Sequence, residues 1–189
     1  MLAAGASSRM GKPKQLLPYN GKNLLQHAVQ EAANSNAAPV IVVLGANAGM
    51  LAKVIDEKNV CVIENMEWEE GMASSVRWGL NTLLKVEPEI DAVIFMVCDQ
   101  PYISSSLLND LIATQLKTGK LIVTSSYGAS IGPPALFHKH IFPELLQLKG
   151  DIGARKIIQQ NSHKVAAVFF PKGNVDIDTK EDYEALKNL

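Results

Sequence analysis

The sequence predicts an α/β domain built on a doubly wound, mostly parallel sheet with helices on both faces, a three-layer, Rossmann-like arrangement. Short runs of β-branched and aromatic residues alternate with helical patterns along the chain, and this alternation is typical of parallel sheets. The runs are continuously apolar, as in strands that are covered on both faces. A length of 189 residues, with 47% hydrophobic and 20% charged residues, suits a single domain with its own core.

Five apolar runs are the expected strands. They occupy residues 40–44, 60–63, 92–97, 121–124 and 165–169. Apolar residues recur at helical spacing near residues 24–33, 51–55 and 107–116. Ser104 is expected to cap the third of these helices, and Thr179 with Asp182 predicts a capping box for a last helix. In sheets of this kind, ligands bind beyond the carboxyl ends of the strands.

Composition excludes several classes of function. Eighteen Lys and Arg residues against nineteen Asp and Glu give a formal net charge of −1 at pH 7. No basic run could follow a phosphate backbone, so nucleic acid is not expected as a partner. The apolar runs are far shorter than the roughly 20 residues that span a bilayer, so no membrane contact is expected. Cys61 and Cys98 are expected to be buried thiols, which together with the lack of a secretory signal favours a cytoplasmic protein.

The segment from Leu2 to Pro18 carries the strongest functional signal. It reads Leu-Ala-Ala-Gly-Ala-Ser-Ser-Arg-Met-Gly-Lys-Pro-Lys-Gln-Leu-Leu-Pro. Small residues from Ala3 to Ser8 let the backbone approach a ligand closely, and consecutive N–H groups in such a loop form a concave anion site. Arg9, Lys12 and Lys14 add positive charge at the same place. The spacing is neither that of a P-loop nor that of the dinucleotide fingerprint, so the loop taken alone fits either a phosphate site or a plain turn.

The whole string resembles the signature of the nucleotidyltransferases that attach a nucleotide to molybdopterin, the molybdenum cofactor cytidylyltransferases and guanylyltransferases. Three further segments are similar to motifs of that family and come in the same order. They are Gly71-Met-Ala-Ser-Ser-Val-Arg-Trp-Gly-Leu80, Cys98-Asp-Gln-Pro101 and Asp176-Ile-Asp-Thr-Lys-Glu-Asp-Tyr183. The resemblance covers essentially the whole chain. It implies a single nucleotidyltransferase domain over residues 1–189, with a nucleotide-binding part at about 1–120 and an acceptor-binding part at 121–189.

One departure from the family lies at the start of the chain. The family has an apolar first strand directly before the Leu2 segment, whereas only Met1 precedes it here. We expect that strand to be absent here or to lie upstream of Met1. A missing central strand would leave backbone groups unpaired, so the departure bears on stability more than on chemistry.

Arg9, Lys14 and Asp99 are the expected catalytic residues. Joining a nucleoside monophosphate to an acceptor phosphate brings two anions together, so cations must neutralise the charge that builds up. In the family the corresponding Arg and second Lys contact the triphosphate, and the resemblance carries these roles to Arg9 and Lys14. Asp99 ends an apolar run, where a carboxylate can hold Mg²⁺. By resemblance it is a metal ligand, and the alternative is an Asp that caps a helix or a turn.

The second metal carboxylate is Asp178 or Asp176. Their side chains project to the same side of an extended segment, because strand side chains alternate with a period of two. The family's terminal motif lies near the metal and the acceptor, so the resemblance places both residues there. Asp176 could instead cap the strand.

Further nucleotide contacts are implied in the opening loop and around residue 71. In the family this second segment lies beside the base and ribose, although N-capping would be the ordinary role of one of its serines. The implied nucleotide-binding set is Leu2, Ala3, Ala4, Gly5, Ser7, Arg9, Lys14, Asn65, Gly71, Ser74 and Ser75. The family's guanylyl branch tends to have a second Gly where this chain has Ala4, which favours CTP over GTP.

Two segments of the C-terminal third correspond to the acceptor pocket of the family. Pro133 and Pro134 follow a Gly and are expected to fix a rigid loop that cannot sit in a central strand. Asp151 is expected near the N-terminus of a following helix, where a carboxylate is favourable. Arg155 either meets a pterin phosphate or is an exposed helix charge.

The resemblance therefore implies Mg²⁺-dependent transfer of CMP from CTP to the terminal phosphate of molybdopterin, with release of pyrophosphate and formation of molybdopterin cytosine dinucleotide. A client molybdoenzyme is a further implied partner. Two alternatives stay open: the same chemistry on a sugar or polyol phosphate, and a non-catalytic chaperone that binds the finished cofactor. The joint presence of Arg9, Lys14 and Asp99 argues against the chaperone.

Overall fold

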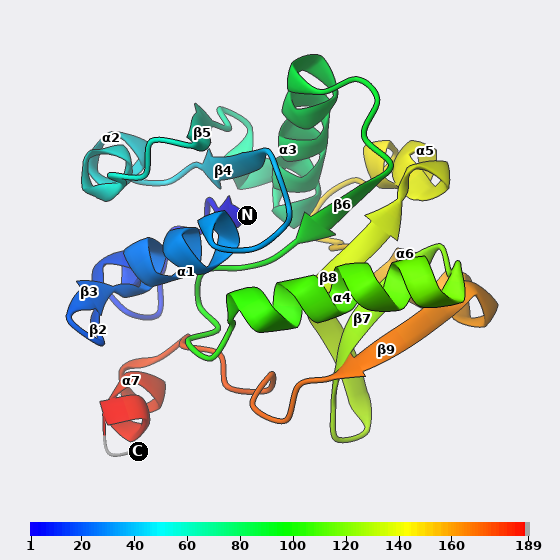
Figure 1. Cartoon of the computed structure of the whole chain (residues 1–189). Coiled ribbons are helices and arrows are strands. Elements are labelled where there is room, and N and C mark those ends of the chain that lie inside the picture. The colour runs from blue at the N-terminus through cyan, green and yellow to red at the C-terminus, as the bar shows by residue number, and fades with distance from the viewer. Residues whose placement is uncertain (188–189) are drawn as a thin grey trace.

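The main strands form two groups that lie between layers of helices (Figure 1), and two further short strands pair only with each other. The structure, a computed structural model, describes residues 1–187. The strands are β1 (Leu2–Ala3), β2 (Pro18–Tyr19), β3 (Lys22–Asn23), β4 (Val40–Leu44), β5 (Val60–Glu64), β6 (Ala92–Phe95), β7 (Ile122–Tyr127), β8 (Ser130–His138) and β9 (Val165–Phe169). The α-helices are α1 (Leu24–Ala33), α2 (Ala48–Leu51), α3 (Met72–Val86), α4 (Ser105–Thr118), α5 (Phe142–Leu146), α6 (Arg155–Gln160) and α7 (Lys180–Lys187).

The first strand group is parallel, with the order β1-β4-β5, and the second has the order β6-β8-β7-β9. β7 and β9 are parallel, whereas β8 runs antiparallel to both of its neighbours. Leu2 joins the groups, because it pairs with Val43 of β4 and donates its N–H to the carbonyl of Met96 at 2.8 Å. The α/β class is confirmed, and the strands expected at residues 40–44 and 165–169 have the predicted bounds.

Apolar side chains pack on both faces of the sheet, which gives three layers. On one face, Leu25 of α1 and Leu111 of α4 pack in a cluster with Val42. On the other face, Leu80 of α3 packs in a second cluster with Phe137 of β8 and with residues of α5 and α6. Strands covered on both faces need continuously apolar sequences, and this explains the pattern from which they were predicted.

Side-chain caps confirm two predicted helix starts. The hydroxyl of Ser104 accepts the N–H of Leu107 at 3.2 Å and caps α4. At the start of α7, the carboxylate of Asp182 accepts the N–H of Thr179 at 2.8 Å, and the Thr179 hydroxyl accepts the N–H of Asp182 at 3.2 Å. These reciprocal bonds fix the direction in which the segment before α7 approaches the sheet.

The expectation that Pro133 and Pro134 cannot lie in a central strand is wrong. Both belong to β8, which lies between β6 and β7. The register pairs Thr124 with Ala135 and then Ser125 with Gly132, so the two prolines fall where the ladder is interrupted by a bulge. A proline cannot donate to a ladder, but no donor is required at a bulge.

A two-residue strand, β1, forms at the start of the opening segment itself. Leu2–Ala3 pairs in parallel with Val43 and Leu44 of β4. Its position between the two strand groups brings the chain that follows it, from Ala4 onward, to the carboxyl ends of the strands. The opening loop therefore lies where ligands of doubly wound sheets bind.

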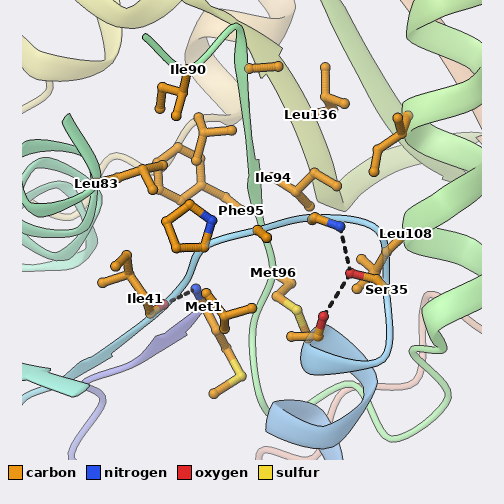
Figure 2. Close-up of a pocket in the computed structure, with 18 of the residues that line it drawn as sticks. Met1, Ser35, Ile41, Leu83, Ile90, Ile94, Phe95, Met96, Leu108 and Leu136 are labelled. Atoms are coloured by element: carbon orange, nitrogen blue, oxygen red, sulfur yellow. Dashed lines mark hydrogen bonds between the residues drawn. The ribbon is translucent and has the colours of Figure 1, made fainter. Parts of the chain in front are cut away.

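At the opposite, amino ends of β4 and β6 lies a cavity of about 280 Å³ (Figure 2). Its lining is mostly apolar and includes Ile41, Leu83 and Phe95. The Met1 ammonium at its edge donates to the carbonyl of Ile41 at 2.7 Å, and burial lowers the pKa of this ammonium to about 5. Leu2 is the one candidate site residue in its lining, so this cavity is separate from the chemistry predicted at the carboxyl ends.

Within residues 1–187, no helix combines the length and apolarity that a membrane crossing requires. Cys61 and Cys98 both carry free thiols, as predicted. Cys98 is buried, and burial raises the pKa of its thiol to about 12, whereas Cys61 is only half-buried. These thiols therefore hold no part of the fold together covalently.

Two leucines of α4 provide a matched test of this packing. Leu111 is 0% exposed and Leu116 is 77% exposed. We expect Leu111→Ala to lower the free energy of unfolding by about 2–5 kcal/mol, because it leaves a cavity in the core. Leu116→Ala should change it by less than about 0.5 kcal/mol. Urea unfolding followed by circular dichroism measures both, and equal losses would contradict the placement of α4.

Candidate active site

Three segments that are far apart in the sequence meet beyond the carboxyl end of β6. They are the opening loop, the turn that carries Asp99, and the segment before α7. The N–H of Ile177 donates to the carbonyl of Asp99 at 2.9 Å, which ties the last segment to the second. Ile177 is 0% exposed and packs in a small cluster with Met10 and Tyr183. This cluster holds the opening loop against α7 and thereby brings residues 9–14 beside residues 176–178.

Gln15, which sequence reasoning missed, shapes the opening loop. Its side chain is 1% exposed, and its amide nitrogen donates to the carbonyls of Ala3 at 3.2 Å and Gly5 at 3.0 Å. Ser7 has a left-handed φ of 56°, and its hydroxyl accepts the N–H of Lys14 at 3.1 Å and donates to the Gln15 amide oxygen at 3.2 Å. Gln15 stands between the charged Lys14 and the apolar Leu16, so the local pattern gave no signal for this role.

Lys14 lies between two of the predicted metal carboxylates. Its Nζ donates to Oδ2 of Asp99 at 2.6 Å and to Oδ1 of Asp178 at 2.7 Å. Arg9 donates from Nη2 to the other oxygen of Asp178 at 2.8 Å. The Lys14 side chain is 13% exposed, whereas that of Arg9 is 67% exposed. The structure thus brings together the three predicted catalytic residues and Asp178.

The charges in this group stabilise one another. Burial lowers the pKa of the Lys14 ammonium, but attraction to Asp99 and the hydrogen bonds to Asp178 and Asp99 outweigh burial, so the pKa is raised overall. The hydrogen bond from Lys14 holds the pKa of Asp178 below its usual value. At neutral pH, Lys14 is therefore an ammonium bound between carboxylates.

Asp176 lies beside this group in a different environment. Loss of surrounding water, and secondly the negative charge of Asp99, raise the pKa of its carboxyl to about 6, although part of the side chain faces solvent. The neighbouring Gln100 is 2% exposed and donates to the carbonyl of Gly173 at 2.8 Å, while its amide oxygen has no partner within residues 1–187. The carboxyl of Asp176 thus differs from those of Asp99 and Asp178, because no lysine or arginine of residues 1–187 forms an ion pair with it.

The donor set fits a hard divalent cation. One oxygen of Asp99 and one of Asp178 contact the same atom, Nζ of Lys14, so the two carboxylates lie close enough to bind one cation. Carboxylate oxygens are the ligands that Mg²⁺ prefers. Over residues 1–187, no group of three or more His, Cys, Asp or Glu side chains could hold a metal ion. The remaining ligands would come from substrate phosphates and water, as is usual for Mg²⁺.

The expectation that Ser74 or Ser75 caps α3 is wrong, because Gly71 occupies the cap position without a side-chain bond. Both serine hydroxyls instead accept from the amide of Asn65, at 2.8 Å and 3.1 Å. Ser74 also donates to the carbonyl of Gly71 at 2.9 Å. Asn65 and Ser74 are 0% exposed and Ser75 is 4% exposed, so these side chains fasten the end of β5 to the first turn of α3.

The backbone of Asp151 packs against the residue that caps α3, Gly71. This corrects the expectation that Asp151 lies at the N-terminus of the next helix along the chain, α6. A Cβ on Gly71, which has a φ of +115°, would come within 2.8 Å of the backbone of Asp151. The helix that follows starts only at Arg155, with Ala154 as its cap residue. The predicted acceptor residues Asp151 and Arg155 are both exposed, Asp151 in the turn before α6 and Arg155 at its first position.

Tyr127 is a second residue that sequence reasoning missed. Its ring lies over Gly132 and Gly173, where a Cβ at either glycine would collide with it. Burial raises the pKa of its hydroxyl, the charge of Asp176 raises it further, and Arg155 lowers it. Tyr127 is therefore within electrostatic reach of both Asp176 and Arg155. Nothing in the local sequence pattern marks this position.

Similarity to named proteins extends over almost the full chain. The chain is 29% identical to the purine catabolism protein PucB of Bacillus subtilis (strain 168), covering 98% of this chain and 93% of that protein. It is 28% identical to a nicotine blue oxidoreductase of Paenarthrobacter nicotinovorans, covering 100% and 92%. A molybdenum cofactor cytidylyltransferase of Escherichia coli (strain K12) is 22% identical, covering 98% and 92%.

Solved structures show the same architecture. Rv0371c of Mycobacterium tuberculosis H37Rv superposes with a TM-score of 0.82 and 31% identity, covering 100% of this chain and 96% of that chain. A structure of Rv0371c in complex with manganese has a TM-score of 0.78 and 28% identity, covering 98% and 94%. A 4-diphosphocytidyl-2C-methyl-D-erythritol synthase of Anaerococcus prevotii, at 16% identity and a TM-score of 0.76 over 99% and 95%, shows the fold alone.

A family model matches most of the chain. The model of the MobA-like NTP transferase domain matches residues 1–165, which include the opening loop and Asp99. The match confirms the predicted resemblance at the level of the nucleotidyltransferase family. It does not identify the acceptor. The chain belongs to the MobA-like NTP transferase family and is a nucleotidyltransferase of that family.

Proposed function

We propose that this chain transfers CMP from CTP to the terminal phosphate of molybdopterin, using a divalent cation and releasing pyrophosphate. The observation that carries the proposal is the joining of Lys14 and Arg9 to Asp99 and Asp178 at the carboxyl end of β6. Cations suited to a triphosphate and carboxylates suited to a metal ion stand at one place, as nucleotidyl transfer requires.

The identities of the nucleotide and the acceptor have separate support. Ala4 at the second position of the Ala-Ala-Gly string favours CTP, by resemblance to the cytidylyl branch. Similarity to the molybdenum cofactor cytidylyltransferase over 98% of the chain supports molybdopterin. Identity is higher with the purine catabolism protein than with the cytidylyltransferase. We therefore expect a connection with purine breakdown, either through a client molybdoenzyme or through a different phosphorylated acceptor.

In the proposed reaction, an oxygen of the acceptor phosphate forms a bond to the α-phosphorus of CTP, and the bond from that phosphorus to the bridging oxygen breaks. Pyrophosphate leaves with the electron pair. Lys14 and Arg9 would hold the triphosphate oxygens and neutralise their charge, while Asp99 and Asp178 would hold the metal ion, with Asp176 beside them. Bound Mg²⁺ would supply further positive charge next to the phosphates. No side chain has to form a covalent bond, because positioning and charge provide the acceleration.

The acceptor would approach from the side of Tyr127 and Arg155. The Tyr127 hydroxyl lies against Gly132 and its ring lies against Gly173, and the charges of Asp176 and Arg155 shift the pKa of the hydroxyl in opposite directions. Pro133 and Pro134 form the adjoining bulge, and Ser125 fixes it by donating to the carbonyl of Pro134 at 2.8 Å. A phosphate placed here would meet the hydroxyl and the guanidinium on the side away from Lys14.

The cytoplasm is the proposed location. The thiols of Cys61 and Cys98 are both free, and unpaired thiols persist where glutathione and thioredoxin keep them reduced.

Pyrophosphate release tests the reaction. With Mg²⁺ and molybdenum cofactor present, and CTP, GTP, ATP and UTP supplied separately, we expect release with CTP. Asp99→Asn should reduce the rate by about a hundredfold or more, because a metal-binding charge is lost. Asp110→Asn, at an exposed position on α4, serves as the matched control and should leave the rate unchanged. A folded protein that is silent with all four nucleotides, or an active Asp99→Asn, would contradict the proposal.

Tyr127→Phe tests the acceptor side. This change keeps the ring over the two glycines and removes only the hydroxyl. We expect KM for the acceptor to rise about fivefold, the equivalent of one hydrogen bond, with KM for CTP unchanged. Steady-state kinetics with each substrate varied in turn measures this. A change in KM for CTP instead would place the acceptor elsewhere.

The raised pKa of Asp176 predicts a pH-dependent stability. The folded chain binds this proton more tightly than the unfolded chain, because the pKa is raised from 3.8 to about 6. Stability is therefore lost as the pH rises from about 4 to about 6. Asp176→Asn should match the wild type below this range and become more stable than the wild type above it. Urea unfolding along a pH series measures the difference in free energy of unfolding between the variant and the wild type, and this difference should grow across the window. A difference that does not depend on pH would contradict the prediction.

A further inference from the structure

Lys14 binds the same carboxylates that a metal ion would need. Its ammonium contacts Oδ2 of Asp99 at 2.6 Å and Oδ1 of Asp178 at 2.7 Å. Arg9 contacts the second oxygen of Asp178 at 2.8 Å. Both oxygens of Asp178 and one of Asp99 are therefore engaged by cations of the protein.

A dication that bridges Asp99 and Asp178 through the two oxygens that Lys14 contacts would have to displace Lys14. An ammonium and a metal ion that share two carboxylate oxygens would repel each other at very short range. The remaining carboxylate, Asp176, has no ion pair within residues 1–187, and no cluster of three or more metal-ligating side chains is present over that range to receive the ion elsewhere.

Displacement of Lys14 requires a new anion. The side chain is only 13% exposed, and a charge removed from its partner in a largely desolvated place is strongly unfavourable. The phosphates of a nucleoside triphosphate are the anions that the opening loop is suited to receive. They could take over Lys14 and Arg9 together while they add oxygen ligands for the metal.

We propose that Lys14 acts as an internal counter-cation that keeps the metal site closed to a metal ion alone, so that the metal enters only together with the nucleoside triphosphate. The proposal rests on the proposed function and adds an order of binding to it. In the exchange, the Lys14 ammonium leaves Asp99 and Asp178 for the phosphates, and the metal takes its place between the carboxylates. No covalent bond changes.

Manganese binding, measured from the electron paramagnetic resonance signal of the free ion, tests this without turnover. On the wild-type chain we expect Mn²⁺ alone to bind weakly, and at least about tenfold more tightly with α,β-methylene-CTP present, or with the corresponding GTP analogue. Lys14→Met should bind Mn²⁺ alone at least about tenfold more tightly than the wild type, and the analogue should then add little.

Two variants serve as controls. Lys117→Met removes an exposed ammonium from α4, outside the opening loop, and should behave as the wild type. Lys14→Arg keeps a cation between the carboxylates and should keep Mn²⁺ alone excluded. If Lys14→Met does not fold, the coupling between Mn²⁺ and the analogue on the wild-type chain and on Lys14→Arg still decides the matter.

The outcomes separate the two proposals. If the wild type binds Mn²⁺ alone as tightly as it does with the analogue, or as tightly as Lys14→Met does, the role of Lys14 as a counter-cation is wrong while nucleotidyl transfer stands. If no nucleotide analogue binds to a folded chain in the presence of Mn²⁺, nucleotidyl transfer itself is overturned.

Discussion

One buried ammonium shared by two carboxylates is the constraint on which the site depends. Lys14 follows the opening loop, Asp99 follows β6, and Asp178 precedes α7. A lysine that is 13% exposed needs both partners, so these three segments must converge whenever the chain is folded. The packing of Ile177 against Met10 provides the apolar part of the same convergence. Charge pairing and packing thus fix the last segment of the described chain to the first.

Buried polar groups hold the opening loop and the start of α3 in place. Asn65 satisfies two serine hydroxyls, and Gln15 satisfies two backbone carbonyls, in surroundings from which water is excluded. Buried polar groups that are fully bonded favour one geometry, because each alternative leaves a group unpaired. The loop and the start of α3 are therefore held in one arrangement, while Arg9 and Lys14 are the charged groups that we propose to meet the phosphates.

The sequence allowed the α/β class, the β4 and β9 bounds and two helix caps to be predicted, because these depend on local pattern. It did not reveal β8, since Pro133 and Pro134 are tolerated there only through a bulge against β7, a non-local feature. Family resemblance predicted that one site would contain Arg9, Lys14, Asp99 and Asp178. It could not predict that these side chains form ion pairs with one another. Gln15 and Tyr127 were missed because their roles depend on what packs over them.

The close approach of Gly71 to Asp151 couples the first turn of α3 to the turn at residues 150–151. Backbone meets backbone at this point, with no side chain between them to yield, and the N–H of Ala73 is bonded to the carbonyl of Gly150 at 3.1 Å. The first turn of α3 and the turn at residues 150–151 must therefore shift as one body. Any displacement of the turn at residues 150–151 would therefore be carried to the first turn of α3 through main-chain contacts alone.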